Sequence, residues 1–202
     1  MDSELPEWGM KQGSNILSVK IGTFIAVVGR SGVGKDSILE GAQSRLDNSL
    51  FYFPRRFITR PADAGGENHM ALTLEEFKFR QTENQFALHW QAHGLYYGLD
   101  EEITGMVGNG LHVIANISRT IIADARLKFE NLRVIEIIAS PETIADRLSL
   151  RDRESQAQQQ ARRQRRIETD WSGGLAITRI TNDGLLSDAI DTFVATVVAD
   201  IA

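Results

Sequence analysis

The chain has 202 residues, of which 22 are Lys or Arg and 27 are Asp or Glu, so its formal net charge is −5. This length suits one α/β domain with a sizeable core, and the acidic balance argues against a nucleic-acid-binding surface. The absence of cysteine excludes disulfides, thiolate zinc sites and a cysteine nucleophile. No apolar run reaches the roughly 20 residues that cross a bilayer, so we expect no membrane partner.

Residues 1–22 are expected to form an N-terminal tail before the first strand. They begin with an acidic stretch, MDSELPEWGMKQGSN, and lack the apolar core of a secretion signal. We therefore expect a cytoplasmic protein whose single domain spans residues 23–202.

A phosphate-binding loop is the most informative motif of the chain. Residues 23–28, TFIAVV, are apolar and β-branched, which predicts a buried parallel strand. The residues that follow, GRSGVGKDS, match the pattern G-x-x-x-x-G-K, and apolar residues at helical spacing come next. This context disfavours the alternative of a plain glycine-rich turn. We expect the loop to bind a nucleoside triphosphate through its backbone N–H groups and a lysine, over Gly29, Arg30, Ser31, Gly32, Val33, Gly34, Lys35, Asp36 and Ser37.

Asp36 stands where phosphate loops usually carry Ser or Thr, whose hydroxyl binds magnesium. A carboxylate here can bind magnesium directly or through water, because hard cations prefer such oxygens; Ser37 can instead supply the oxygen after a slight shift. The alternative is an acidic residue that stabilises the first turn of a helix through its macrodipole. We favour a metal site at Asp36 and Ser37, since a cation would relieve the repulsion between a carboxylate and a triphosphate.

Apolar strand-like runs alternate with amphipathic stretches along the rest of the chain, which predicts a three-layer α/β fold with a parallel central sheet. A final helix is marked by an apolar stripe that runs from Leu186 to Ile201. The other expected elements are a helix at 35–46, a strand near 51–58, a helix at 74–82, a strand at 86–91, a helix near 100–108, a strand at 111–115, a helix at 119–129, a strand at 132–138 and a helix from Pro141 to about Leu150.

Residues 151–166, RDRESQAQQQARRQRR, contain six arginines in a chain that is acidic overall. Such a charged, Gln-rich run usually indicates a solvated helix face or a disordered stretch. Its position after the strand predicted at 132–138 favours instead a mobile lid that shields a transferring phosphoryl group and balances its charge. The candidate catalytic arginines are Arg151, Arg153 and Arg162, with Arg166 as a further candidate.

Several blocks resemble the guanylate-kinase-like nucleoside monophosphate kinases, namely the phosphate loop, Thr59-Arg60-Pro61, Leu74 to Phe77, Tyr96-Tyr97-Gly98 and Thr181-Asn182-Asp183. The resemblance implies that Thr-Arg and a Tyr-Gly turn hold the acceptor phosphate, and that Asn182 lies against the adenine of ATP. Three positions depart from that family: Leu88 replaces the Glu that reads guanine, Leu99 replaces a small hydroxyl residue, and the second phosphate-binding Arg would fall near Asp63 and Ala64. Because losing such partners costs orders of magnitude in discrimination, guanine is a poor candidate.

The combination of blocks resembles more closely the ribose 1,5-bisphosphate phosphokinases of bacterial phosphonate catabolism. The blocks that carry this resemblance are Gly34-Lys35-Asp36-Ser37, Arg56 to Arg60, Gly66-Glu-Asn-His69, Leu88-His-Trp90, His93-Gly-Leu95, Tyr97-Gly98, Asn116 with Ser118-Arg119, and Arg151 to Ser155. The resemblance implies an ATP- and Mg²⁺-dependent kinase that converts ribose 1,5-bisphosphate to 5-phosphoribosyl 1-diphosphate. The acceptor-binding region is expected at about 51–98 and the lid at about 151–166. The sequence does not reveal the oligomeric state, and a homodimer is kept as one possibility.

A sugar bisphosphate needs two cationic clamps, and arginine grips phosphate bidentately. The candidates are Arg56, Arg60 and Arg119, with a hydrogen bond from Tyr97. His69 and Asn116 are polar candidates for the ribose hydroxyls or the metal shell, although a lone His is as often structural. Trp90 is expected to pack, and the roles of His89 and His93 stay open.

Two other functions compete with this kinase. One is a nucleoside monophosphate kinase with an altered base preference, which would share the phosphate loop, Arg60 and Tyr97. The other is a non-enzymatic scaffold of the guanylate-kinase type, which is disfavoured because Lys35 and the arginine-rich segment are both present.

Overall fold

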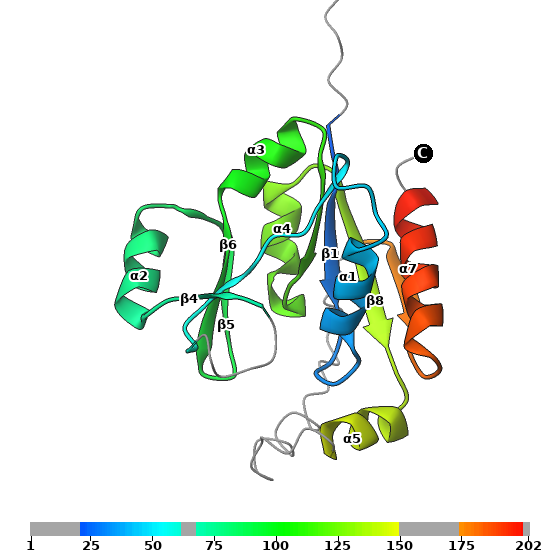
Figure 1. Cartoon of the computed structure of the whole chain (residues 1–202). Coiled ribbons are helices and arrows are strands. Elements are labelled where there is room, and N and C mark those ends of the chain that lie inside the picture. The colour runs from blue at the N-terminus through cyan, green and yellow to red at the C-terminus, as the bar shows by residue number, and fades with distance from the viewer. Residues whose placement is uncertain (1–20, 62–67, 150–173, 200–202) are drawn as a thin grey trace, which may run out of the picture.

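The computed structural model describes residues 21–61, 68–149 and 174–199. Its centre is a parallel sheet with the strand order β2-β7-β1-β8-β9 (Figure 1). The strands are β1 (Phe24–Val28), β2 (Phe51–Tyr52), β7 (His112–Asn116), β8 (Leu132–Ile138) and β9 (Ile177–Thr181). All five residues of β1 are fully buried, as expected for a central strand that is covered on both faces.

Helices cover both faces of this sheet, so the fold has three layers (Figure 1). One face packs on α1 (Lys35–Gln43), α5 (Pro141–Ser149) and α7 (Leu186–Ala199). The other face packs on α3 (Glu102–Gly108), the 3₁₀ turn η2 (Arg119–Ile121) and α4 (Ile122–Lys128). Successive β1 side chains point to opposite faces, so Ile25 and Val27 join the first core, whereas Phe24 and Ala26 join the second. No helix in the described part of the chain is both long and apolar enough to cross a membrane.

A second, four-stranded sheet lies beside the first, with the strand order β4-β3-β6-β5 (Figure 1). Its elements are β3 (Phe57–Ile58), β4 (Met70–Ala71), β5 (Phe86–Ala92), β6 (Leu95–Asp100) and the helix α2 (Leu74–Thr82). A small aromatic core of Phe57, Phe77 and Phe86 holds α2 against it. The β5–β6 hairpin turns through His93 and Gly94, both with positive φ, which is the geometry of a two-residue hairpin turn.

Most predicted elements are confirmed, and α2 and β8 have the predicted bounds. The single strand predicted near 51–58 is wrong, because β2 and β3 belong to different sheets and Pro54 lies between them. The expected Tyr-Gly turn is also wrong, since Tyr97 and Gly98 pair within β6. The strands β4, β6 and β9 were not predicted, and the helix predicted at 35–46 ends at Gln43.

Replacing Phe193 by alanine is expected to destabilise the protein by about 3–5 kcal/mol. This side chain has no exposed surface and joins α7 to the core on the α1 face, so its removal leaves a cavity. Urea unfolding of the two proteins measures the difference. Val198→Ala on the same helix is the control; its side chain is 45% exposed, so its effect should stay within about 0.5 kcal/mol. Equal effects of the two substitutions would contradict the assigned core.

Candidate active site

The phosphate loop runs from the end of β1 to the start of α1 and is held by close contacts below it. A Cβ on Gly29 would lie 2.4 Å from the carbonyl oxygen of Ile137. Gly34 has φ +90°, and a Cβ there would lie 2.5 Å from Nδ2 of Asn182. Both positions therefore require glycine, because a side chain at either would collide with the residues packed beneath the loop.

Asn182 lies beneath this loop. Its side chain is 1% exposed and its Nδ2 donates to the carbonyl oxygen of Val33 at 2.8 Å. Asn182 is not among the residues that line the two hollows described below. The observed contact supports the loop, and the predicted contact between Asn182 and adenine stays a prediction.

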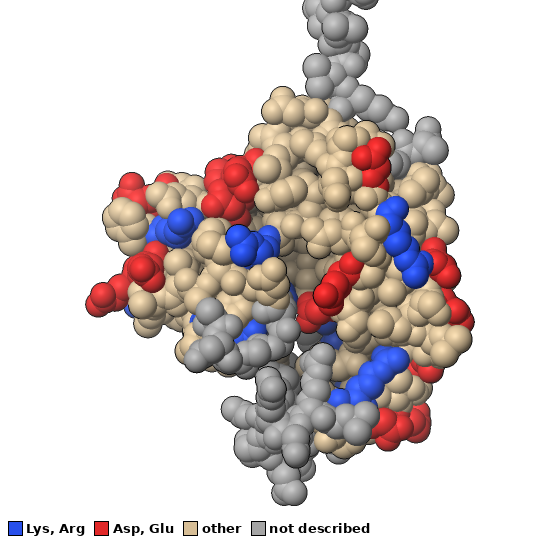
Figure 2. Space-filling view, viewed as in Figure 1, with Lys and Arg blue, Asp and Glu red and all other residues tan. Residues whose placement is uncertain are grey.

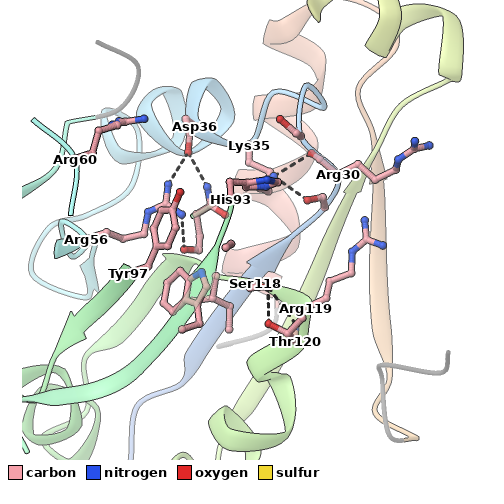
Figure 3. A pocket seen from close by; sticks show the side chains of 16 residues that line it. Arg30, Lys35, Asp36, Arg56, Arg60, His93, Tyr97, Ser118, Arg119 and Thr120 are labelled. Carbon is pink, nitrogen blue, oxygen red and sulfur yellow. Dashed lines mark hydrogen bonds and ion pairs between the residues drawn. The ribbon is translucent and has the colours of Figure 1, made fainter. Parts of the chain in front are cut away.

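Lys35 lies across the loop at the N-terminus of α1. Its Nζ donates to the carbonyl oxygens of Gly29 at 2.9 Å and Arg30 at 3.1 Å (Figure 3). A triphosphate in the loop would exchange these carbonyl partners for charged phosphate oxygens, which make stronger hydrogen bonds with an ammonium group.

A cavity of about 280 Å³ opens beside Lys35 (Figure 3). Its walls come from the phosphate loop, the segment before β3, the β5–β6 hairpin and the segment after β7. The structure thereby brings ten predicted site residues to one cavity: Gly29, Arg30, Ser31, Lys35, Asp36, Arg56, Arg60, Tyr97, Asn116 and Arg119. We refer to it as the Lys35 pocket. Selected residues between Arg56 and Thr120 thus meet the loop in space, although they lie far from it in sequence.

A second hollow of about 900 Å³ lies between α1 and the second sheet, where Figure 2 shows a recess in the surface. Asp36, Arg56, Arg60 and Asn116 line both hollows and therefore stand between them. Its other walls carry three acidic side chains, Glu40, Asp100 and Glu102. An anionic acceptor is therefore better matched to the Lys35 pocket, where the acidic side chain of Asp36 is outnumbered by basic ones.

Asp36, Arg56 and Asn116 are joined by two hydrogen bonds and one ion pair between the two hollows (Figure 3). Oδ1 of Asp36 accepts from Nδ2 of Asn116 at 2.7 Å and lies 3.6 Å from Nη2 of Arg56. Nη1 of Arg56 donates to the backbone oxygen of Asn116 at 3.2 Å, and its guanidinium lies 5.7 Å from the ring centre of Tyr97. Burial lowers the pKa of Arg56, and the negative charge of Asp36 opposes that shift.

Arg60 lines the same pocket and is braced by His69. Nε2 of His69 lies 3.1 Å from the backbone oxygen of Arg60, and Nδ1 lies 3.4 Å from Nη2 of Arg60. Because a carbonyl only accepts, Nε2 carries the hydrogen and Nδ1 accepts from the guanidinium. His69 is 8% exposed and does not line the pocket, so its observed contacts position Arg60. A direct role of His69 with the substrate or metal stays a prediction.

Arg119 begins η2 and lines the pocket on the side away from Arg56 and Arg60, with its guanidinium on the same side as that of Arg30 (Figure 3). Its Nε lies 3.8 Å from Oε1 of Glu136, whose Oε2 accepts from Nε of Arg179 at 3.1 Å. Burial lowers the pKa of Arg119, and Glu136 opposes the shift. Glu136 and Arg179 were not predicted as site residues. Glu136 could have been found as the one charged residue within the otherwise apolar end of β8, VIEII.

Of the aromatic and histidine candidates, some pack against neighbouring side chains and some line the Lys35 pocket. Trp90 is 7% exposed and stacks on Tyr97 with ring centres 5.4 Å apart, so it packs as expected while its edge also lines the pocket. His93 lines the pocket from the hairpin turn, and His89 does not. The lid arginines Arg151, Arg153, Arg162 and Arg166 lie outside the described residues.

The donors near the loop suit magnesium only if a nucleotide completes its coordination. Within the described ranges, no group of three or more His, Cys, Asp or Glu side chains could hold a metal ion. Asp36 and Ser37 offer a carboxylate and a hydroxyl, which are hard oxygen donors, and phosphate and water oxygens complete such sites.

No protein-family model matches the chain, but curated relatives do. The chain is 44% identical over 173 residues to the ribose 1,5-bisphosphate phosphokinase PhnN of Chromobacterium violaceum, covering 86% of this chain and 92% of the relative. A relative of the same name from Brucella melitensis is 40% identical over 173 residues, which cover 85% of this chain and 90% of the relative. The chain also matches a bifunctional ribose 1,5-bisphosphokinase-thymidine phosphorylase of Azorhizobium caulinodans at 40% identity over 90% of this chain, but spans 26% of that longer protein.

The solved structures support the fold. Guanylate kinase from Anaplasma phagocytophilum aligns with a TM-score of 0.63 and 17% identity, over 89% of this chain and 86% of that one. The predicted phosphate-loop kinase fold is therefore confirmed. Together with the identities to curated relatives, this shows that the chain belongs to the ribose 1,5-bisphosphate phosphokinase family.

Proposed function

We propose that this protein transfers the γ-phosphoryl group of ATP to ribose 1,5-bisphosphate, giving 5-phosphoribosyl 1-diphosphate and ADP. The observation that carries the proposal is the Lys35 pocket, in which the phosphate-loop lysine shares one cavity with Arg56, Arg60 and Arg119. These cations match a triphosphate donor and an acceptor that bears two phosphates. The names of the curated relatives point to the same reaction.

The chemistry requires no general base. A phosphate has a second pKa of about 6, so the acceptor oxygen is already anionic near neutral pH. In the proposed step, an oxygen of the sugar's 1-phosphate attacks the γ-phosphorus, and the bond from γ-phosphorus to the β–γ bridging oxygen breaks, so that ADP leaves. The protein would then accelerate the reaction by aligning the two phosphates and by neutralising their charge.

Each site residue has a part in this proposal. The backbone of the phosphate loop and Lys35 hold the triphosphate. Arg56, Arg60 and the hydroxyl of Tyr97 hold the 1-phosphate, and Arg119, from the other side of the pocket, holds the 5-phosphate. Asn116 and His69 complete the acceptor side, and Asn182 the nucleotide side. The lid arginines Arg151, Arg153 and Arg162 balance the charge on the transferring group.

Magnesium would be held by the hydroxyl of Ser37 and the second carboxylate oxygen of Asp36, beside the phosphates. It would supply neutralisation of the negative charge that builds up on the triphosphate. We place the reaction in the cytoplasm, and a homodimer stays a prediction that sedimentation would test.

The rival nucleoside monophosphate kinase is disfavoured by two leucines. Leu88 and Leu99 face each other across β5 and β6, are 4% and 0% exposed, and pack into the core that contains α3. These are the positions at which the guanylate kinases carry the residues that read the base. Two buried apolar side chains offer a purine no hydrogen-bond partner, so the enzyme could not distinguish one base from another at this place.

Phosphorus NMR of the purified protein with ATP and Mg²⁺ tests the proposal. Ribose 1,5-bisphosphate is offered beside GMP, AMP, UMP and CMP in equal amounts. We expect a new diphosphate doublet from the sugar, no GDP, UDP or CDP, and no consumption of AMP. Fast turnover of any nucleotide without turnover of the bisphosphate would establish the rival kinase, and failure to bind ATP with Mg²⁺ by calorimetry would revive the scaffold.

A further inference from the structure

Asp36 makes contacts that no magnesium ligand requires. Its Oδ1 accepts a hydrogen bond from Nδ2 of Asn116 at 2.7 Å and lies 3.6 Å from Nη2 of Arg56. Arg56 in turn donates to the backbone oxygen of Asn116 at 3.2 Å, so each of the three residues contacts the other two. The three residues come from the first turn of α1, the segment before β3 and the end of β7. The residue directly after Lys35 is therefore tied to the acceptor side of the pocket.

Arg56 needs such a partner because it is largely buried. Its side chain is only 13% exposed, and a buried charge is costly unless a counter-charge and hydrogen bonds accompany it. The ring of Tyr97 supports one face of the guanidinium at 5.7 Å. A ring fixes the plane of a guanidinium but leaves its rotation within that plane open, whereas a carboxylate and a carbonyl at its corners determine the rotation.

We propose that Asp36 is a positioning residue that orients Arg56 and Asn116 toward the acceptor phosphate. The inference rests on the proposed function, in which Arg56 belongs to the clamp for the 1-phosphate. Since Lys35 and Asp36 are consecutive residues at the start of α1, the donor lysine and the acceptor clamp are carried by one rigid helical turn. A hydroxyl at position 36 is too short to make the same link, which explains the departure from the usual Ser or Thr.

The expected effect falls on the rate and not on acceptor affinity. Loss of the carboxylate would remove a repulsion between Asp36 and the incoming phosphate, which raises the affinity for the acceptor. This gain in affinity offsets the weaker binding of the phosphate by a less ordered Arg56. We therefore expect the acceptor KM to change by no more than about threefold. A misplaced clamp disturbs the alignment of the reacting atoms, and a shift of about 1 Å lowers kcat by about 100-fold.

Asp36→Ser is the decisive variant, because it restores the usual hydroxyl for magnesium while it breaks the link to Arg56. We expect kcat to fall by about 100-fold even at saturating Mg²⁺. Glu40→Gln is the matched control, since Glu40 lies on the same helix about one turn later and its loss removes the same charge. Wild-type kcat in Asp36→Ser at saturating Mg²⁺ would overturn the proposal and leave Asp36 as a metal ligand.

A double-mutant cycle with Arg56→Ala tests whether Asp36 acts through Arg56. If it does, Asp36→Ser costs little more once Arg56 is already absent, so the two losses in kcat do not multiply. Losses that multiply would show that Asp36 acts independently of Arg56 and would overturn the proposal. Melting temperatures of all four proteins separate this result from a general loss of stability.

Side-chain NMR of protein labelled with ¹⁵N-arginine gives a test that needs no turnover. We expect slowly rotating Nη signals of Arg56, assigned with Arg56→Lys, in the wild type and in Glu40→Gln but not in Asp36→Ser. Persistence of these signals in Asp36→Ser would overturn the proposal whichever acceptor the enzyme uses. Absence of ribose 1,5-bisphosphate turnover by the wild type would instead refute the proposed function, while this comparison would still decide the role of Asp36.

Discussion

Replacing Lys35 by alanine is expected to lower kcat by at least about 1,000-fold. Nζ of Lys35 bridges the carbonyl oxygens of Gly29 and Arg30 across the loop, and this is where the β- and γ-phosphates would lie. Among the residues that the structure describes, no other lysine lines the Lys35 pocket. The substitution therefore removes a charge that follows the γ-phosphoryl group during transfer, and the neighbouring arginines are held in other contacts.

Single-turnover kinetics with ribose 1,5-bisphosphate measures this loss. Lys78→Ala is a matched control, because Lys78 is an exposed residue of α2 and its loss removes the same charge far from the loop. Circular dichroism should show the same fold for both variants. An unchanged kcat in Lys35→Ala would refute the assignment of residues 29–37 as the triphosphate site.

Replacing Arg60 by alanine is expected to raise the KM for ribose 1,5-bisphosphate by about 10- to 100-fold and to leave the KM for ATP unchanged. A hydrogen bond to a charged group contributes about 1.5–3 kcal/mol, which corresponds to that range. Arg60 lines the Lys35 pocket and is held there by His69, so it can grip a phosphate with little loss of freedom.

Arg55→Ala separates this effect from a general loss of positive charge. Arg55 is exposed and lines the second hollow but not the Lys35 pocket, so its removal should leave both KM values near those of the wild type. A change confined to ATP affinity in Arg60→Ala would assign Arg60 to the triphosphate side and remove it from the acceptor clamp.

The predicted elements that agree with the structure are those that local pattern specifies. β1 is a continuous apolar run, β8 is a mostly apolar run interrupted by Arg133 and Glu136, and α2 begins with a capping box in which Thr73 and Glu76 bond each other's backbone N–H groups. The split of residues 51–58 could not be predicted in this way, because β2 and β3 find partners far along the chain. Strand pairing depends on those distant partners more than on the strand's own residues.

The sequence alone established the phosphate loop, because its glycines, Lys35 and the flanking apolar runs act within about 25 residues of one another. It also singled out the candidate cations of the proposed acceptor clamp by their residue type. Their arrangement required the folded chain: the contact of Asp36 with Asn116 joins residues 80 positions apart, and that of Arg56 with Asn116 joins residues 60 apart. Such contacts carry no local signature, since they form only when the carboxyl ends of parallel strands meet at one edge of the sheet.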